Sequence, residues 1–206
     1  NDNTAVGYDS LGVNTTGVNN TAIGKDVLES NTEGSNNTAI GYQSLEENTT
    51  GNGNTAVGYQ AMESNVTGTR NVAVGMQALE DNTASDNTAV GSFALLQNTS
   101  ATRCTAVGSY SLAANTTGSD NDGFGYGALN LNTTGYQNAA FSRSALTANT
   151  TGHSNVAMGY LAGTANTTGS NNTSVGTGAG YQLTTGDHNV CIGRYSGNSL
   201  TTGGYN

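Results

Sequence analysis

The chain has 206 residues, contains no Pro, and carries a net charge of −9 with only five Lys and Arg residues. Charged residues make up 9% of it, far below the roughly 25% of ordinary soluble domains, so it offers no basic surface for nucleic acid or anionic membranes. No apolar run approaches the roughly 18 residues of a transmembrane helix, so we expect no membrane insertion. There is no secretion signal and no initiator Met, so we expect a mature product or a fragment of a longer chain.

A repeat of 17 residues runs through the whole sequence. Its marker is the Gly of the string N-T-A-V-G, which recurs at 17-residue intervals from Gly7 to Gly193, with Ser142 in one slot. One interval, from Gly75 to Gly91, is 16 residues, which places a deletion in the turn around residues 83–86. Such repeats are typical of solenoids, whose stacked coils bury a core that no single coil can bury. We predict an all-β parallel solenoid of about twelve coils, forming one domain over residues 1–206.

Each coil predicts the same elements in chain order. A short strand over T-A-V ends at a tight bend near the Gly, a second short strand follows over Y-Q-A-L, and a longer turn covers N-T-T-G and the adjoining S-N-N. Asn and Gly favour such turns because they tolerate the left-handed region. Strands of neighbouring coils would pair about 4.8 Å apart, which stacks the Asn columns into amide ladders and gives a rod of about 58 Å.

Two apolar columns are the candidate core. Val, Ile, Phe or Met precedes the Gly in all twelve coils, and Leu or Met lies four residues after it in the first nine. We expect both to be buried, so that Val57→Asp or Val74→Asp unfolds local coils. In the last coils, residues 159–206, Gly163, Gly180 and Gly197 replace the Leu. This change is either drift between copies or a different cross-section at the junction to a following domain.

The string N-T-A-[VI]-G-Y-Q-[AS]-L, as at Asn37 to Leu45, resembles the head repeat of YadA-like trimeric autotransporter adhesins and similar repeats of phage tail fibres. The resemblance covers the chain coil by coil, although the adhesin repeat is typically shorter. It implies a left-handed parallel β-roll, a homotrimer, and a role in attachment on a cell or virion surface. Val57 to Met62 also resembles the hexapeptide of left-handed β-helix acyltransferases, but that fold needs about three hexapeptides per coil and this chain has one.

Few residues suggest chemistry. His153 and His188 occupy different columns and have no evident partner for general base catalysis. Asp120, Asn121, Asp122 and Gly123 echo part of a calcium loop without its closing Glu, and we favour a polar turn. The N-x-[ST] sequons, such as those of Asn48 and Asn65, follow from the turn sequence itself. We predict no enzyme activity, no catalytic residue, no cofactor and no metal site.

Two further expectations come from the coil register. Glu29, Glu46, Glu63 and Glu80 each lie five residues after the Gly in successive coils, so they should form one solvent-exposed acidic strip. The strip either keeps the rod soluble or binds divalent cations or a basic partner weakly. Cys104 and Cys191 lie five coils apart, about 24 Å, which is too far for a disulfide.

Three functions follow from these patterns. The first is a structural or adhesive fibre segment, extracellular or on a virion, acting as a homotrimer with a receptor of unknown identity. The second is a self-assembling filament subunit, because an uncapped solenoid end invites end-to-end stacking. The third is an ice-binding solenoid, which requires a ranked Thr file on a flat face. Solution mass and electron microscopy separate the three.

Overall fold

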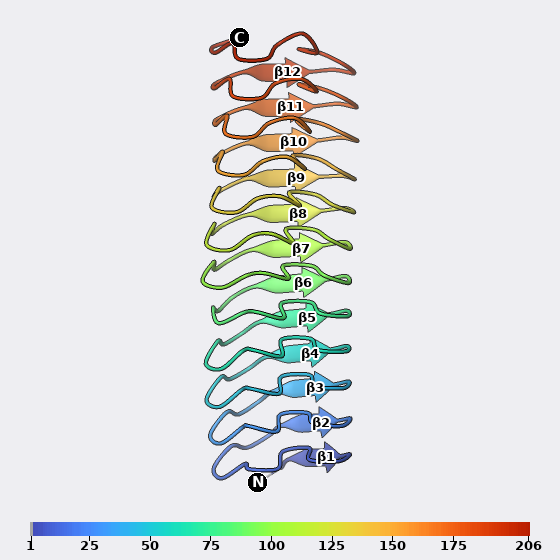
Figure 1. Ribbon diagram of the computed structural model, residues 1–206, viewed down its shortest axis with the longest axis vertical. Helices are drawn as coiled ribbons and strands as arrows, with labels where there is room; N and C mark the ends of the chain where they lie inside the picture. Colours follow the sequence, from blue (N-terminus) through green and yellow to red (C-terminus); the bar gives the residue numbers. More distant parts are fainter. Residues whose placement is uncertain (1) are drawn as a thin grey trace.

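The computed structural model describes residues 2–206, which form one straight stack of coils with a single strand in each coil (Figure 1). All twelve strands belong to one parallel sheet whose order follows the chain. The strands are β1 Thr4–Val6, β2 Thr21–Ile23, β3 Thr38–Ile40, β4 Thr55–Val57, β5 Val72–Val74, β6 Thr88–Val90, β7 Thr105–Val107, β8 Asp122–Phe124, β9 Ala139–Phe141, β10 Val156–Met158, β11 Thr173–Val175 and β12 Val190–Ile192. The predicted all-β parallel solenoid with a 17-residue coil is confirmed.

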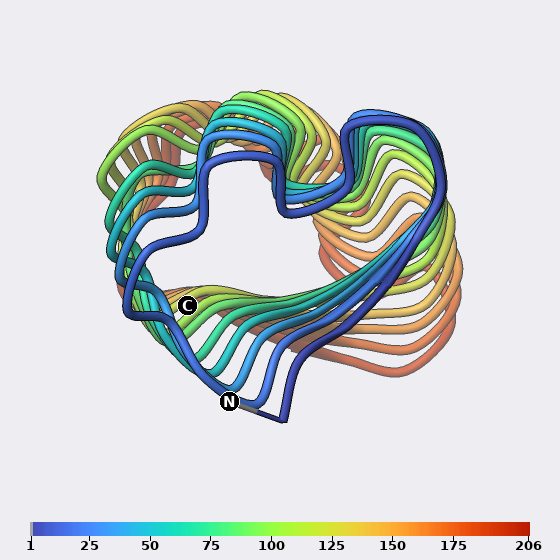
Figure 2. The same ribbon diagram turned by 90° about the horizontal axis from the view of Figure 1, so that it is seen from below.

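Viewed from the N-terminal end, the chain turns anticlockwise as it recedes, which is a left-handed winding (Figure 2). The register carries through the one short coil, because β5 pairs with β6 as Val72 with Thr88, 16 residues apart. Backbone and side-chain bonds in the turn after Thr83 also join residues 16 apart, such as Arg70 and Asp86. The deletion therefore lies in that turn, as predicted, and leaves the sheet intact.

Within each strand the middle residue points inward and its two neighbours point outward. Ala56 and Ala73 are fully buried, whereas Val74 is 36% exposed and Ile40 37% exposed. Side chains alternate across a strand, so a buried Ala column forces the Val column to the outer side. The expectation that Val57 and Val74 belong to the core is wrong.

The predicted second strand is also absent. The segment that follows each Gly is a series of bends in which two residues per coil, such as Gln43 and Leu45, have φ near +54°. A left-handed conformation costs about 1–2 kcal/mol for a residue with a side chain. The Leu column offsets this cost by burial, since Leu28, Leu45 and Leu79 are inaccessible to solvent, and full burial of a Leu side chain is worth roughly 1.5–3 kcal/mol.

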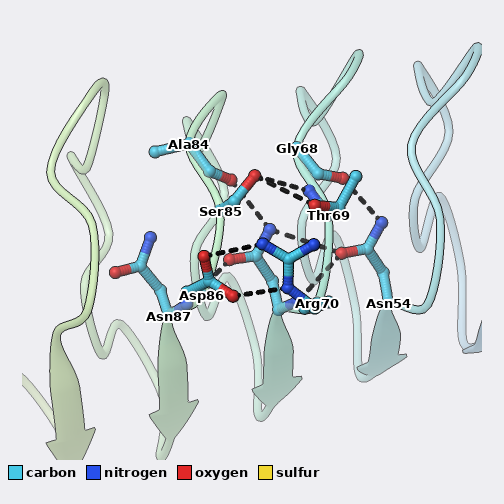
Figure 3. A network of polar contacts seen from close by, with 9 residues as sticks. Asn54, Gly68, Thr69, Arg70, Ala84, Ser85, Asp86 and Asn87 are labelled. Carbon is cyan, nitrogen blue, oxygen red and sulfur yellow. Dashed lines mark hydrogen bonds and ion pairs between the residues drawn. The ribbon is translucent and has the colours of Figure 1, made fainter.

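The interior is thin and partly polar. Apolar contacts come from the strand Ala, the small residue three after each Gly, and the Leu or Met four after it. Two Asn columns complete the interior. In one, the backbone N–H of Asn71 donates to Oδ1 of Asn54 at 3.0 Å, and Nδ2 of Asn54 donates to the carbonyl of Gly68 at 2.8 Å (Figure 3).

The second Asn column opens the N-T-T-G turn. Nδ2 of Asn48 donates to Oδ1 of Asn31 at 2.7 Å and to the carbonyl of Gly51 at 3.2 Å. The predicted amide ladders are confirmed, and they lie inside the molecule. Most buried amides of this column are therefore paired with a counterpart in an adjacent coil, which offsets the cost of burying them. The Oδ1 atoms of Asn98 and Asn166 are buried without a hydrogen-bond partner among the described residues.

Two features favour Gly as the bend residue. Gly58 has a φ of +145°, and a Cβ there would lie 2.7 Å from the carbonyl carbon of Gly75 in the next coil. Ser142 occupies the same slot with a φ of +129°. The coil of Ser142 therefore carries local backbone strain that the other coils avoid.

Residues 159–206 keep the same sheet while the interior packing changes. Gly163, Gly180 and Gly197 have φ near +60°, like the Leu that they replace. Leu183, which stands where the other coils have the turn Asn, is buried. Cys191 replaces a strand Ala, and its Sγ fills the space that a side chain at Gly197 would need. Apolar volume has thus moved between columns.

Candidate interaction surfaces

The largest regular surface is the outer side of the sheet, which we call the strand face. It is made of the first and last residues of each strand, from Thr4 and Val6 of β1 to Val190 and Ile192 of β12. Of these side chains, only Asp122 bears a charge. The last residues of the strands are Val, Ile, Phe or Met throughout, and exposures of 36–46% are common among them away from the ends of the rod.

The four Glu residues of the acidic strip are stacked as predicted, but they are half-buried rather than fully exposed. Burial raises the pKa of Glu46 and of Glu63, and neighbouring carboxylates raise both further, Glu29 for Glu46 and then Glu46 and Glu80 for Glu63. Oε2 of Glu46 is buried and has no hydrogen-bond partner among the described residues. Charge repulsion is therefore built into this part of the rod.

A file of Gln side chains lies beside the acidic strip. Nε2 of Gln60 donates to Oε1 of Gln43 at 3.3 Å, and Nε2 of Gln77 contacts both carboxylate oxygens of Glu80 at 2.9 Å. These amides relieve part of the repulsion, since the bond from Gln43 lowers the pKa of Glu46 against the larger effect of burial.

An alternating charge file, which sequence reasoning missed, runs through the residues five before each Gly in four coils. Nε of Arg70 donates to Asp86 at 2.6 Å and Nη2 of Arg70 donates to it at 2.9 Å (Figure 3). Arg103 donates to Asp120 with the same two distances. The guanidinium groups lower the pKa of both Asp residues. The order Arg, Asp, Arg, Asp in one column was the sequence signal for these pairs.

The two His residues are each stacked on a Tyr of the adjacent coil. The ring centroids of His153 and Tyr136 are 4.6 Å apart, and those of His188 and Tyr205 are 4.8 Å apart. Neither His contacts the other, as their different columns predicted. The stacking of each His on a Tyr was not predicted, although the two residues of each pair are 17 residues apart and so occupy the same position in adjacent coils.

The calcium-like segment does not converge on one point. Asp120 is paired with Arg103, Asn121 donates its buried amide to the carbonyls of Gly118 and Gly135, and Asp122 begins β8 on the strand face. Within residues 2–206, no three His, Cys, Asp or Glu side chains are grouped closely enough to hold a metal ion.

Cys104 and Cys191 are buried and unbridged, which confirms the predicted absence of a disulfide between them. Cys104 stands in an Asn column, and burial raises the pKa of its thiol to about 11. Its Sγ lies 3.3 Å from the carbonyl of Gly118, where the other coils place an Asn amide. The thiol therefore acts as a substitute rung in the ladder.

The described part of the chain has no enclosed cleft or pocket. It also has no apolar helix of the length that crosses a bilayer. Comparison of the chain with protein-family models, curated proteins and solved structures found no match.

Proposed function

We propose that this chain is a structural and adhesive fibre segment that associates with two further copies of itself, side by side, through the strand face. The observation that carries the proposal is the placement of the Val column on the outside of the sheet. A rigid rod supplies reach, and lateral association supplies stiffness and repeated attachment surfaces. The resemblance to adhesin head repeats and phage tail-fibre repeats supports a homotrimer and a location outside the cell or on a virion surface.

The size of the strand face supports association. Twelve ranks at about 4.8 Å and a width of two outward residues give a strip of roughly 58 Å by 7 Å, about 400 Å². Its last-residue column is a continuous apolar stripe along the rod, and the largest apolar patch of a soluble protein, about 300–600 Å² on a typical monomer, is often functional. In a molecule with a net charge of −9, a face whose only charge is Asp122 is also the surface on which copies repel each other least.

An ice-binding role would use the same face. Its first outward column has Thr in β1–β4, β6, β7 and β11, but Val72, Asp122, Ala139, Val156 and Val190 interrupt it. The second outward column contains no Thr. These interruptions favour apolar packing against another copy over an array of hydroxyls.

Sedimentation equilibrium of the native chain and two matched variants tests the proposal. Val74 and Val66 are both 36% exposed, but only Val74 belongs to a strand. We expect the native chain and Val66→Lys to sediment as trimers and Val74→Lys to sediment as a monomer. A monomeric native chain, or a mass that grows without limit as in a filament, overturns the trimer. Inhibition of ice recrystallisation by a monomer that Val74→Lys abolishes would assign the face to ice instead.

A further inference from the structure

A second exposed strip follows the residues that come directly after the bend Gly in coils eight to twelve. It consists of Tyr126, Arg143, Tyr160, Thr177 and Arg194, and we call it the Arg–Tyr strip. All five side chains are exposed. Cζ of Arg143 lies 5.8 Å from the ring centre of Tyr126 and 5.9 Å from that of Tyr160, and Cζ of Arg194 lies 4.9 Å from the ring centre of Tyr195.

These two Arg residues differ from the other cations of the molecule. Lys25, Arg70 and Arg103 each pair with a carboxylate, at 3.0, 2.6 and 2.6 Å respectively. Among the described residues, Arg143 and Arg194 form no ion pair. A guanidinium stacked against aromatic rings uses its faces and leaves the N–H donors at its edge for a planar anion. The strip therefore presents two available anion contacts.

The charge of the surrounding rod permits an anionic partner here. Residues 1–91 contain eleven Asp and Glu and two Lys and Arg, a net charge of −9, whereas residues 92–206 contain three of each, a net charge of zero. Glu80, the nearest member of the acidic strip, lies four coils from Arg143, about 19 Å away along the rod. That distance exceeds twice the Debye length of about 8 Å at physiological salt. Two carboxylates of this half of the chain form no ion pair among the described residues: Asp122, one coil before Arg143, and Asp187, in the same coil as Arg194.

We infer that the Arg–Tyr strip binds an extended anionic polysaccharide, with the Arg side chains on its carboxylate or sulfate groups and the Tyr side chains against its sugar rings. The inference rests on the attachment role proposed above and names its partner. Arg143 and Arg194 are three coils apart, about 14 Å, which suits charges spaced along a polymer better than one small anion. The strip lies on a surface without a pocket, and a chain laid along the rod needs none.

The probes are immobilised hyaluronan, which carries carboxylates, chondroitin sulfate, which adds sulfates, and neutral dextran. We expect the native protein to bind one or both anionic polymers and not dextran, with affinity falling as salt rises. Arg143→Gln should weaken binding about tenfold, since it removes a charge-assisted contact, and Arg143→Gln with Arg194→Gln should abolish it. Arg70→Gln, which removes an exposed but paired cation, should leave binding unchanged.

Asp122→Asn provides a test that unfolding cannot imitate, because it should strengthen binding by removing a repulsive charge one coil from Arg143. Equal binding to dextran, no binding to either anionic polymer, or equal losses in Arg70→Gln and Arg143→Gln would overturn the inference. Sedimentation of the same samples keeps it separate from the proposed trimer. A monomer that binds hyaluronan contradicts only the trimer, and a trimer that binds no polymer contradicts only the strip.

Discussion

The thiol of Cys104 leaves the backbone N–H of Asn121 without the side-chain oxygen that the other coils supply. This is the one break in the ladder of Asn residues that precede the strands. Elsewhere an Asn Oδ1 accepts the N–H of the next coil, as Asn121 does for Asn138 at 2.9 Å. Cys104 has no such oxygen for Asn121. We expect Cys104→Asn to raise the free energy of unfolding by about 0.5–1.5 kcal/mol per restored hydrogen bond, as measured by urea denaturation. Cys104→Ser serves as the control, and greater stability in the Ser variant than in the Asn variant would argue against a ladder.

Ser142 is the only non-Gly residue at the bend of a coil, and its φ of +129° is strained. Replacing it with Gly should stabilise the protein by about 1–3 kcal/mol, the usual cost of such a conformation. The reverse change, Gly58→Ala, should destabilise it, because the added Cβ would meet the backbone of Gly75. Melting temperatures of the two variants check both signs. A Ser142→Gly protein that melts lower than the native chain would contradict the bend geometry.

Leu79 and Val74 separate the inside of the rod from its outside. Leu79 is inaccessible to solvent, so Leu79→Ala should cost about 2–5 kcal/mol through lost burial and a cavity. Val74→Ala should change the stability of the monomer by no more than about 0.5 kcal/mol. Chemical denaturation at concentrations where the chain is monomeric makes the comparison. Similar losses of unfolding free energy in the two variants would show that the Val column belongs to the core.

The acidic strip should make stability depend on salt. Four stacked carboxylates about 4.8 Å apart repel each other by about 0.9 kcal/mol per neighbouring pair even at the dielectric constant of water. Changing Glu29, Glu46, Glu63 and Glu80 together to Gln should raise the melting temperature at low salt and flatten its dependence on ionic strength. Changing Asp2, Asp9, Glu33 and Asp187 to Asn or Gln, which removes as much charge elsewhere, should have a smaller effect.

Stability should also pass through a maximum in mildly acidic solution. The raised pKa values of Glu46 and Glu63 mean that the folded state binds their protons more tightly, so stability rises as pH falls toward their ordinary value of 4.5. The pKa values of Asp86 and Asp120 are lowered from their ordinary value of 3.8 in the folded state. As pH falls below 3.8, protonation of these carboxylates removes the Arg pairs, so the free energy of unfolding falls. Glu46→Gln with Glu63→Gln should flatten the first limb of a melting curve against pH, and Asp86→Asn the second.

The coil length, the strand position, the Asn ladders and the stacked Glu residues could be predicted because each depends only on a residue's place in the 17-residue repeat. The side occupied by Val57 could not, because an apolar column in a three-residue strand can pack against the core or against another chain. The conformation of Leu45 could not either, since left-handed φ values are rare for Leu. The pairing of Arg70 with Asp86 could have been predicted, because both residues occupy the same position of the repeat in successive coils and carry opposite charges.

The backbone hydrogen bonds between coils run along the long axis of the rod, and each strand contacts only the strands directly before and after it. A pull on the two ends therefore loads these bonds in series rather than together. The coil at an end detaches first, and its 17 residues extend to about 58 Å at 3.4 Å per residue. The length gained, about 50 Å per coil, lets the rod absorb mechanical work one coil at a time, as a tether under flow must do.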